Sequence, residues 1–534
     1  MIILILAFFC SFFVAWAIVP GLAKYARKYG LVDHPDNKRK LHQDAIPMVG
    51  GLSLFITTLL VVPVAVYFAF TFKPFFHSLG EMLLGWIPVD FARRSLRLTA
   101  GDYRELTGLV IGSGILVIVG VLDDRFQIRG RQKLFGQIIA TTVLILFGFH
   151  FNEIAIAGFH FKFKVFSVFF VYAWVLAAIN SVNLLDGADG IAASIGIIMG
   201  LALTMMAVYS GLMINALITI VIAGALLGFL RYNFPPAKVY LGDTGSMLIG
   251  FLLAAIAIRC ASKQGSAFAF FAPVAFLAIP FIDTTAAIIR RRLTGRSIFA
   301  VDRGHLHHSL MKQGYSPKIA LLWVVSLSAM TAIGGILSFV NEQSEYALVS
   351  IGLVVLVLLS CKIFGVAEYK LVSRKAYSVA KTVLNLNQDV QQSSVHVQGS
   401  RDWQVDWDEL CQFADNMKLK EITLDLNAPW LHESFHATRK NSENSEKGGG
   451  NAWKAQVPLL AGGRSFGRIE VRGAQSVDHH QVIRGLLDFI GNLENSLVDV
   501  AATNTDPGDL NGGNGGESVS SSISEQDIEA PTSL

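Results

Sequence analysis

Long apolar runs separated by short polar segments make up most of residues 1–366. A membrane-spanning helix needs about 20 apolar residues, and by that rule the chain has eleven candidate spans. They cover residues 1–22, 48–72, 105–122, 134–150, 165–182, 191–209, 211–230, 244–260, 266–289, 318–340 and 345–366. The pattern therefore predicts an all-α polytopic membrane domain over residues 1–366. A partly alternating stretch at 151–164, centred on Gly158, predicts a small hairpin outside the membrane.

The hydrophobic pattern changes after residue 366. Residues 367–401 are polar and favour a linker helix, and residues 402–502 predict a small soluble α+β domain of unknown role. We expect helices at 403–417 and 480–501, strands at 421–426, 455–460 and 468–472, and a long polar loop at 436–451. Residues 503–534 are rich in Gly, Ser and acids, which predicts a disordered tail.

Composition supports the membrane assignment. Hydrophobic residues make up 52% of the chain and charged residues 16%, whereas soluble domains carry about 25% charged residues. The net charge of +4 gives no reason to expect a nucleic-acid partner. The four cysteines form no CxxC pair, so neither a disulfide framework nor a zinc-finger pattern is indicated.

Basic residues mark one side of the membrane. Lysines and arginines follow the first, third, seventh and ninth spans (Lys24, Arg27, Lys28, Lys38, Arg39 and Lys40; Arg125, Arg129, Arg131 and Lys133; Arg231 and Lys238; Arg290, Arg291, Arg292, Arg296 and Arg303). The positive-inside rule places these loops and the C-terminus in the cytoplasm, so the protein would be a multi-pass protein of the inner membrane. Residues 73–104 disagree because this outer segment carries several arginines, and we expect an interfacial helix there.

The most informative polar segment is residues 180–190, which reads NSVNLLDGADG between two apolar runs. Polar residues at such a junction are costly unless they face water, a metal or a substrate. An ordinary loop between helices is the simpler interpretation. We favour a functional site because the segment offers short oxygen-bearing side chains and glycines but no Lys or Pro.

Other polar groups fall on the same predicted face. Asp123 and Asp124 end the third span, a YLGDTGS segment opens the eighth, and DRGHLHH follows the ninth. Each has a simpler interpretation: Asp123 and Asp124 could flank a helix C-terminus, although acids there oppose the helix dipole, Asp243 could be a helix N-cap, and the histidines could be a zinc site or a solvated loop. Lys133 could likewise be only a positive-inside residue. The grouping of all these segments on one face favours a shared site.

The acids and bases together indicate phosphoryl transfer. Asp123, Asp124, Asp186, Asp189 and Asp243 would repel an anionic substrate unless a hard cation such as Mg²⁺ or Mn²⁺ intervened. Lys133, Arg303 and the histidines would hold phosphate oxygens. A secondary transporter is the alternative, but its acids would lie near the bilayer midplane rather than at helix ends on one face. A scaffold with an inactive membrane domain is a third reading, which the full set of acids disfavours.

These motifs resemble the polyprenyl-phosphate N-acetylhexosamine-1-phosphate transferases, the WecA/TagO/MraY family. The matching pieces are RKLH at 39–42, IPMVGG at 46–51, GVLDD at 120–124, 180–190, 241–250 and HLHH at 305–308. The HLHH segment is similar to the HIHH motif of the UDP-N-acetylglucosamine group and departs from the HHH motif of the group that uses UDP-MurNAc-pentapeptide. The resemblance implies transfer of N-acetylglucosamine 1-phosphate from a UDP-sugar donor to undecaprenyl phosphate, with Mg²⁺ as cofactor. A different UDP-sugar donor is left open, and so is a homodimer.

The resemblance also implies roles for individual residues. Asp243 and Asn183 would bind Mg²⁺, and Asp123 and Asp124 would act at the lipid phosphate as base or metal-site acids. The substrate-binding residues would be Lys133, Asn180, Asp186, Asp189, Tyr240, Arg303, His305, His307 and His308. Among these, Asp186, Asp189 and Tyr240 would border the uridine, while Lys133 and Arg303 would contact the diphosphate.

Overall fold

A computed structural model of the chain describes residues 1–33, 45–72, 99–150, 154–156, 159–161, 164–264, 270–293, 304–361, 373, 390–398, 403–428, 433–441, 453–461, 464–474 and 477–504. Residues 73–98 of the expected interfacial segment, most of the linker at 367–401 and nearly all of the tail after 502 lie outside these residues. Residues 100–104 of that segment begin a helix that continues to Phe126. The same holds for the RKLH segment and for Arg303.

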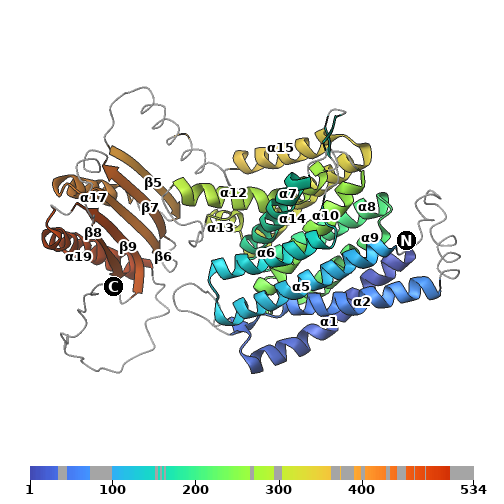
Figure 1. The fold of residues 1–534 in the computed structure, drawn as a ribbon. Coiled ribbons are helices and arrows are strands. Elements are labelled where there is room, and N and C mark those ends of the chain that lie inside the picture. The colour runs from blue at the N-terminus through green and yellow to red at the C-terminus, as the bar shows by residue number, and fades with distance from the viewer. Residues whose placement is uncertain are drawn as a thin grey trace, which may run out of the picture.

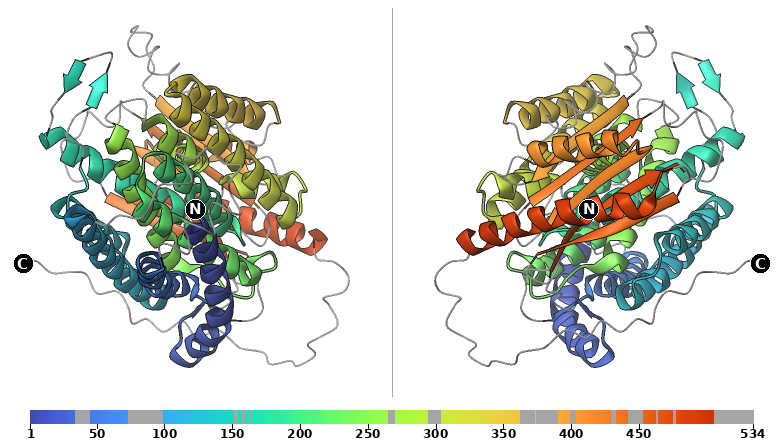
Figure 2. Two further views of the ribbon diagram at one scale, coloured as in Figure 1. Left: turned by 90° about the vertical axis from the view of Figure 1, so that its right-hand side faces the viewer. Right: turned by 90° about the vertical axis from the view of Figure 1, so that its left-hand side faces the viewer.

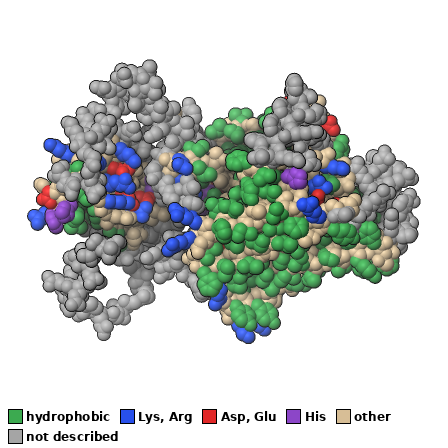
Figure 3. All heavy atoms as spheres, viewed as in Figure 1, with side chains coloured by type: hydrophobic (Ala, Val, Ile, Leu, Met, Phe, Trp, Pro, Cys, Tyr) green, Lys and Arg blue, Asp and Glu red, His purple; other side chains and the backbone are tan. Residues whose placement is uncertain are grey.

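The described part of residues 1–366 is a helical bundle (Figure 1). Eight of its helices are long and apolar enough to cross a membrane. They are α1 (Ile2–Tyr29), α2 (Gly50–Thr71), α5 (Ala100–Phe126), α7 (Lys164–Leu185), α8 (Ile191–Tyr209), α9 (Met213–Asn233), α10 (Gly242–Gln264) and α14 (Pro317–Asn341). Hydrophobic side chains cover much of the visible outside of the bundle (Figure 3). The exposed large hydrophobic residues of the chain include Phe9, Phe13 and Phe135. The chain is therefore a multi-pass membrane protein.

Three of the expected spans differ from the sequence prediction. Helices α6 (Gly130–Leu146) and α15 (Ser344–Ser360) have 17 residues each. The expected helix at 266–289 is divided into α11 (Phe271–Phe276) and α12 (Ala278–Leu293), with a break at Leu277. Pro280 lacks the N–H that would bond to the carbonyl of Phe276 four residues earlier, which explains why the helix does not continue through this point.

Glycines let three helices meet at the start of α10. A Cβ atom on Gly51 of α2 would lie 2.5 Å from the Cα of Gly245, and one on Gly120 of α5 would overlap the backbone of Thr244. The backbone N–H of Gly51 donates to the carbonyl of Leu241 at 2.9 Å. The glycines of IPMVGG and GVLDD therefore hold α2 and α5 tightly against the turn that carries Asp243.

Two pairs of short strands accompany the described helices of the bundle. Next to α2, β1 (Val32–Asp33) pairs with β2 (Ile46–Pro47), and Met48 bridges to Tyr240. The predicted hairpin is confirmed as the antiparallel pair β3 (Ile154–Ile156) and β4 (Phe159–Phe161).

The C-terminal region is an antiparallel sheet with helices against one face (Figure 2). The strand order is β5-β7-β6-β9-β8, with β5 (Val390–Gln398), β6 (Glu421–Ala428), β7 (Glu433–Asn441), β8 (Trp453–Ala461) and β9 (Arg464–Gly473). Helices α17 (Gln404–Asn416) and α19 (His479–Asn504) complete it. Its core includes Trp407, Leu424, Val471 and Leu486.

Two strands of this sheet were missed. The sequence interpretation placed a linker over β5 and a polar loop over most of β7, whereas both are paired strands. Residues on the outer face of β7, such as Thr438 and Lys440, alternate with inward residues such as Ala437. The alternation was hidden because buried polar residues, His436 and Thr438, stand on either side of Ala437.

Candidate active site

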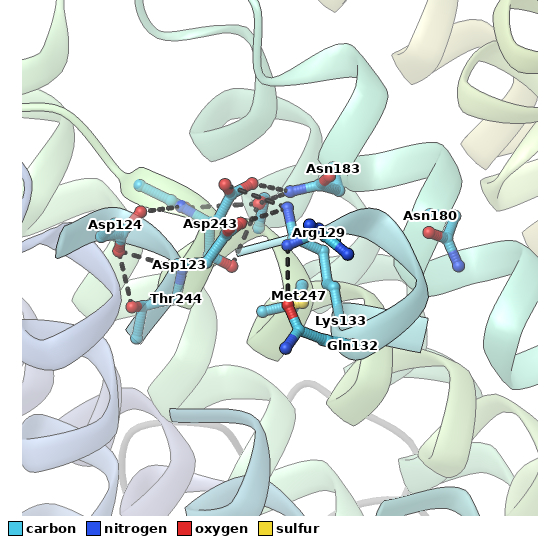
Figure 4. A network of polar contacts seen from close by, with 12 residues as sticks. Asp123, Asp124, Arg129, Gln132, Lys133, Asn180, Asn183, Asp243, Thr244 and Met247 are labelled. Atoms are coloured by element: carbon cyan, nitrogen blue, oxygen red, sulfur yellow. Dashed lines mark hydrogen bonds and ion pairs between the residues drawn. The ribbon is translucent and has the colours of Figure 1, made fainter. Parts of the chain in front are cut away.

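Four segments bring an acid-rich cluster together at one end of the bundle (Figure 4). Lys133, in the first turn of α6, lies 3.0 Å from Asp243 Oδ2 at the start of α10 and also pairs with Asp123 near the end of α5. Asn183, near the end of α7, donates to Asp243 Oδ1 and, at 2.8 Å, to Ser246 Oγ. The Asp123 and Asp243 carboxyl groups are themselves within hydrogen-bonding reach. Two acids thus share one lysine.

Asp124 points in a different direction from its neighbour. Its carboxylate accepts hydrogen bonds from the Asp243 N–H at 2.7 Å, the Thr244 N–H at 3.3 Å and the Thr244 hydroxyl at 2.7 Å. These contacts satisfy the free backbone donors at the N-terminus of α10. Asp124 therefore holds the helix that presents Asp243, while Asp123 faces Lys133.

Asn180 lies beside the acid cluster rather than within it. Its Nδ2 donates to Gln137 Oε1 at 2.8 Å, which joins α7 to α6. Gln137 is buried and lies one turn after Lys133 on α6. Sequence reasoning missed Gln137, although its spacing from Lys133 places both residues on one helix face.

The segment after α7 positions its two acids differently. Burial and the nearby carboxylates of Asp243, Asp124 and Asp189 raise the pKa of Asp186. Asp189 Oδ2 accepts a hydrogen bond from the Ala237 N–H at 2.9 Å and so fixes the loop that leads to Tyr240.

Tyr240 is held mainly through its backbone. Its N–H donates to the Pro47 carbonyl at 2.8 Å, and its carbonyl accepts from Gly50 at 3.1 Å. Burial, followed by the charges of Asp189 and Asp33, raises the pKa of its phenol to about 12. Tyr240 therefore presents a neutral phenol that is half-buried and lies near the acids.

The histidines surround the start of α13 (Leu306–Lys312). His307 is buried against Gly187, and neither of its ring nitrogens has a hydrogen-bond partner among the described residues. Burial, followed by the neighbouring histidines, lowers its pKa well below the usual value, so the ring is neutral. The His307 and His308 ring centroids are 4.2 Å apart, and those of His305 and His307 are 6.1 Å apart.

His305 has a partner that sequence reasoning did not find. Its Nδ1 lies 2.7 Å from Asp283 Oδ2, and Asp283 Oδ1 accepts from the Leu306 N–H at 2.8 Å. Asp283 is a single acid within an apolar run, 22 residues before His305. Burying an unpaired carboxylate in such a run is costly. An isolated Asp there therefore indicates a buried partner, and this was the signal available in the sequence.

A hard cation fits the oxygen donors of this cluster. Among the described residues, no group of three or more His, Cys, Asp or Glu side chains could hold a metal by itself. The Asp123 and Asp243 carboxylates are nevertheless donors that Mg²⁺ uses when substrate phosphates and water complete its coordination. Asn183 would offer its amide oxygen only after the amide group turned, because its nitrogen faces Asp243. Two adjacent carboxylates with one shared lysine also favour an added positive charge.

Comparisons with known proteins give a consistent result. Residues 106–261 match the glycosyl transferase family 4 domain. The chain is 30% identical over 349 residues to the decaprenyl-phosphate N-acetylglucosaminephosphotransferase of Mycolicibacterium smegmatis, covering 61% of this chain and 79% of that protein. It is 29% identical over 340 residues to the probable undecaprenyl-phosphate N-acetylglucosaminyl 1-phosphate transferase of Bacillus subtilis, covering 63% and 85%. It is also 29% identical over 329 residues to the undecaprenyl-phosphate alpha-N-acetylglucosaminyl 1-phosphate transferase of Escherichia coli, covering 59% and 78%.

Proposed function

Because this chain belongs to glycosyl transferase family 4, we propose that it transfers N-acetylglucosamine 1-phosphate from UDP-N-acetylglucosamine to undecaprenyl phosphate. The products are undecaprenyl-diphosphate-N-acetylglucosamine and UMP. Such a product would begin a lipid-linked glycan of the cell envelope. The names of its relatives support the sugar phosphate and the polyprenyl-phosphate acceptor.

The observation that carries this proposal is the shared lysine. Lys133 lies between Asp123 and Asp243 at the end of a membrane bundle, where a lipid phosphate and a soluble nucleotide could both arrive. A transporter site near the bilayer midplane would need these groups well inside the spans. Here they lie in the last turn of α5 and the first turns of α6 and α10.

The charged residues of the cluster suit the transfer of a phosphoryl group. An oxygen of the acceptor phosphate forms a bond to the β-phosphorus of the donor, and the bond from that phosphorus to the bridging oxygen breaks, releasing UMP. Lys133 would hold phosphate oxygens as negative charge builds up, and Asp123 would take a proton from the acceptor phosphate or orient it. Asp124 would keep Asp243 in place through the N-terminus of α10.

We propose that Mg²⁺ is the cofactor, with Mn²⁺ as a substitute. Asp243 and Asn183 would hold it, with Asp123 close by, and the cation would neutralise the donor diphosphate. His305, His307, His308 and Arg303 would serve the sugar-diphosphate, and Asp186, Asp189 and Tyr240 would border the nucleoside. Asn180 would support the donor site through its contact with Gln137.

We also propose that the protein lies in the inner membrane, with the site and the C-terminal sheet on its cytoplasmic side. Eleven segments would enter the bilayer. The basic residues Arg125, Arg129 and Arg131 border the site, which is the arrangement expected on the cytoplasmic side. In Figure 1 the C-terminal sheet lies beyond the end of the bundle at which α5 passes into α6.

The test is incubation of the purified protein with undecaprenyl phosphate and a panel of UDP-sugars, followed by measurement of UMP and of the lipid product. UDP-N-acetylglucosamine should give both products, EDTA should abolish them, and added Mg²⁺ should restore them. Preference for UDP-MurNAc-pentapeptide would overturn the donor assignment. Full turnover in EDTA would remove the metal from the mechanism, and no UMP from any donor would overturn the transferase assignment.

A further inference from the structure

Asp283 lies on α12, outside the acid cluster, and joins two parts of the histidine segment. One carboxylate oxygen lies 2.7 Å from His305 Nδ1, and the other accepts the Leu306 N–H at 2.8 Å. Both Asp283 and His305 are buried. A single side chain thus contacts both the first histidine ring and the first backbone donor of α13.

A second residue of α12 supports the same segment. A Cβ atom on Gly304 would lie 2.5 Å from the guanidinium carbon of Arg290, so Arg290 packs directly against the residue before His305. Asp283 and Arg290 are two helical turns apart and therefore lie on the same face of α12. This face holds the backbone of Gly304 and Leu306 on either side of His305.

The geometry also selects one form of the His305 ring. A carboxylate can only accept a hydrogen bond, so Nδ1 must carry the proton that points at Asp283. A bound ligand can then change the protonation of His305 only at Nε2. A buried carboxylate that fixes a histidine in this way orients the ring and selects its tautomer.

We propose that Asp283 is a positioning residue that presents His305 to the sugar-diphosphate donor. This inference rests on the proposed function. Asp283 acts through the His305 ring, and its contact with Leu306 only keeps α13 in place. Removing its charge while keeping its shape therefore weakens the use of the donor and leaves the use of the lipid acceptor unchanged.

The decisive variant is Asp283→Asn. The amide oxygen can still accept from the Leu306 N–H, but the amide nitrogen would face His305 Nδ1 and force the opposite tautomer. We expect the KM for UDP-N-acetylglucosamine to rise by about tenfold, the effect of losing one strong hydrogen bond, with the KM for undecaprenyl phosphate unchanged. Thr284→Val is the matched control, because this neighbouring buried hydroxyl has no hydrogen-bond partner among the described residues.

A double-mutant cycle with His305→Ala separates positioning from general stability. If Asp283 acts through His305, Asp283→Asn should have no further effect on the donor KM in the His305→Ala protein. Additive losses would overturn the proposal, as would an Asp283→Asn protein indistinguishable from Thr284→Val. A wild-type protein that releases no UMP would instead refute the proposed function, so the two failures are distinguishable.

Discussion

The acids at the start of α10 and the acids on the C-terminal sheet have opposite surroundings. On the sheet, Glu421 pairs with Lys440 at 3.0 Å and with Arg472 at 3.3 Å, each directly across from it on a neighbouring strand. In the membrane domain, Asp123 and Asp243 share Lys133. On the sheet Glu421 has two basic partners, whereas in the bundle two acids share one lysine.

This difference indicates where a ligand is needed. A ladder of matched cross-strand pairs is complete without any partner and contributes modestly to stability. A cluster with excess negative charge is costly unless a cation or a proton arrives. The ring nitrogens of buried His307, which have no hydrogen-bond partner in the described part of the chain, show the same incompleteness. We therefore place the chemistry in the bundle and assign the sheet no chemical role.

Asp243→Asn should produce the largest effect. The variant keeps the size of the side chain and removes the charge that would hold the cation, so UMP release should fall about 10²-fold or more. Ser246→Ala is the control, because it removes only one of the two partners of Asn183 and should cost much less. Near-normal turnover in a folded Asp243→Asn protein would contradict the site.

The two consecutive acids should separate by stability as well as by rate. In Asp124→Asn the amide nitrogen would face an N–H of α10, so both melting temperature and turnover should fall, the latter by about tenfold. Asp123→Asn should reduce turnover and lower the melting temperature less than Asp124→Asn, because relief of the repulsion with Asp243 offsets the lost charge pair with Lys133. Thermal unfolding in detergent and UMP release measure the two quantities.

Thr244→Val tests the same interpretation from the other side of the contact. It removes the hydroxyl that donates to Asp124 and keeps the side-chain volume, whereas Thr244→Ser keeps the hydroxyl. We expect Thr244→Val to follow Asp124→Asn in direction and Thr244→Ser to remain close to wild type. Equal behaviour of the two Thr244 variants would refute the capping role.

The sequence predicted the cluster because its members are short polar motifs inside apolar runs. Asp123, Asn183 and Asp243 each interrupt a hydrophobic pattern at a helix end, where polarity is costly and therefore informative. Asp283 could not be found this way, since it stands alone in an apolar run and its partner lies 22 residues later. The separate roles of Asp123 and Asp124 depend on side-chain direction, which adjacent positions do not reveal.

The fold shows the same limits. The apolar runs predicted eight helices that the structure has as candidate spans. They did not predict the break at Leu277, because an average over hydropathy ignores the missing N–H of Pro280. Strand β7 was read as a loop because most of its residues in the predicted loop are polar, including the buried Thr438 and the exposed Lys440, and Ala437 is a small apolar residue among them.

Removing the sheet should leave the chemistry intact. A chain cut before β5, at residue 389, keeps every described member of the acid cluster and the histidine segment. We expect its KM values and turnover in detergent to match the full chain, measured by UMP release on equal amounts of folded protein. A truncated protein that inserts and folds but loses turnover would show that the sheet completes the site.

The smallest effect on stability should come from the ladder itself. Glu421→Gln removes two pairs whose basic partners, Lys440 and Arg472, are 58% and 51% exposed. Pairs this exposed are screened by water, so unfolding free energy should change by less than about 1 kcal/mol. Ile422→Ala, at the adjacent buried position of β6, should cost about 2–5 kcal/mol.

Neither of these sheet variants should alter the transferase reaction. Proteolysis of the full chain reports the stability of the sheet, and UMP release reports the reaction. A Glu421→Gln protein with an intact sheet and reduced turnover would connect the ladder to the site. Removing a fully paired acid would then have changed the chemistry. The presence of basic partners would therefore no longer tell a structural acid from a functional acid in this chain.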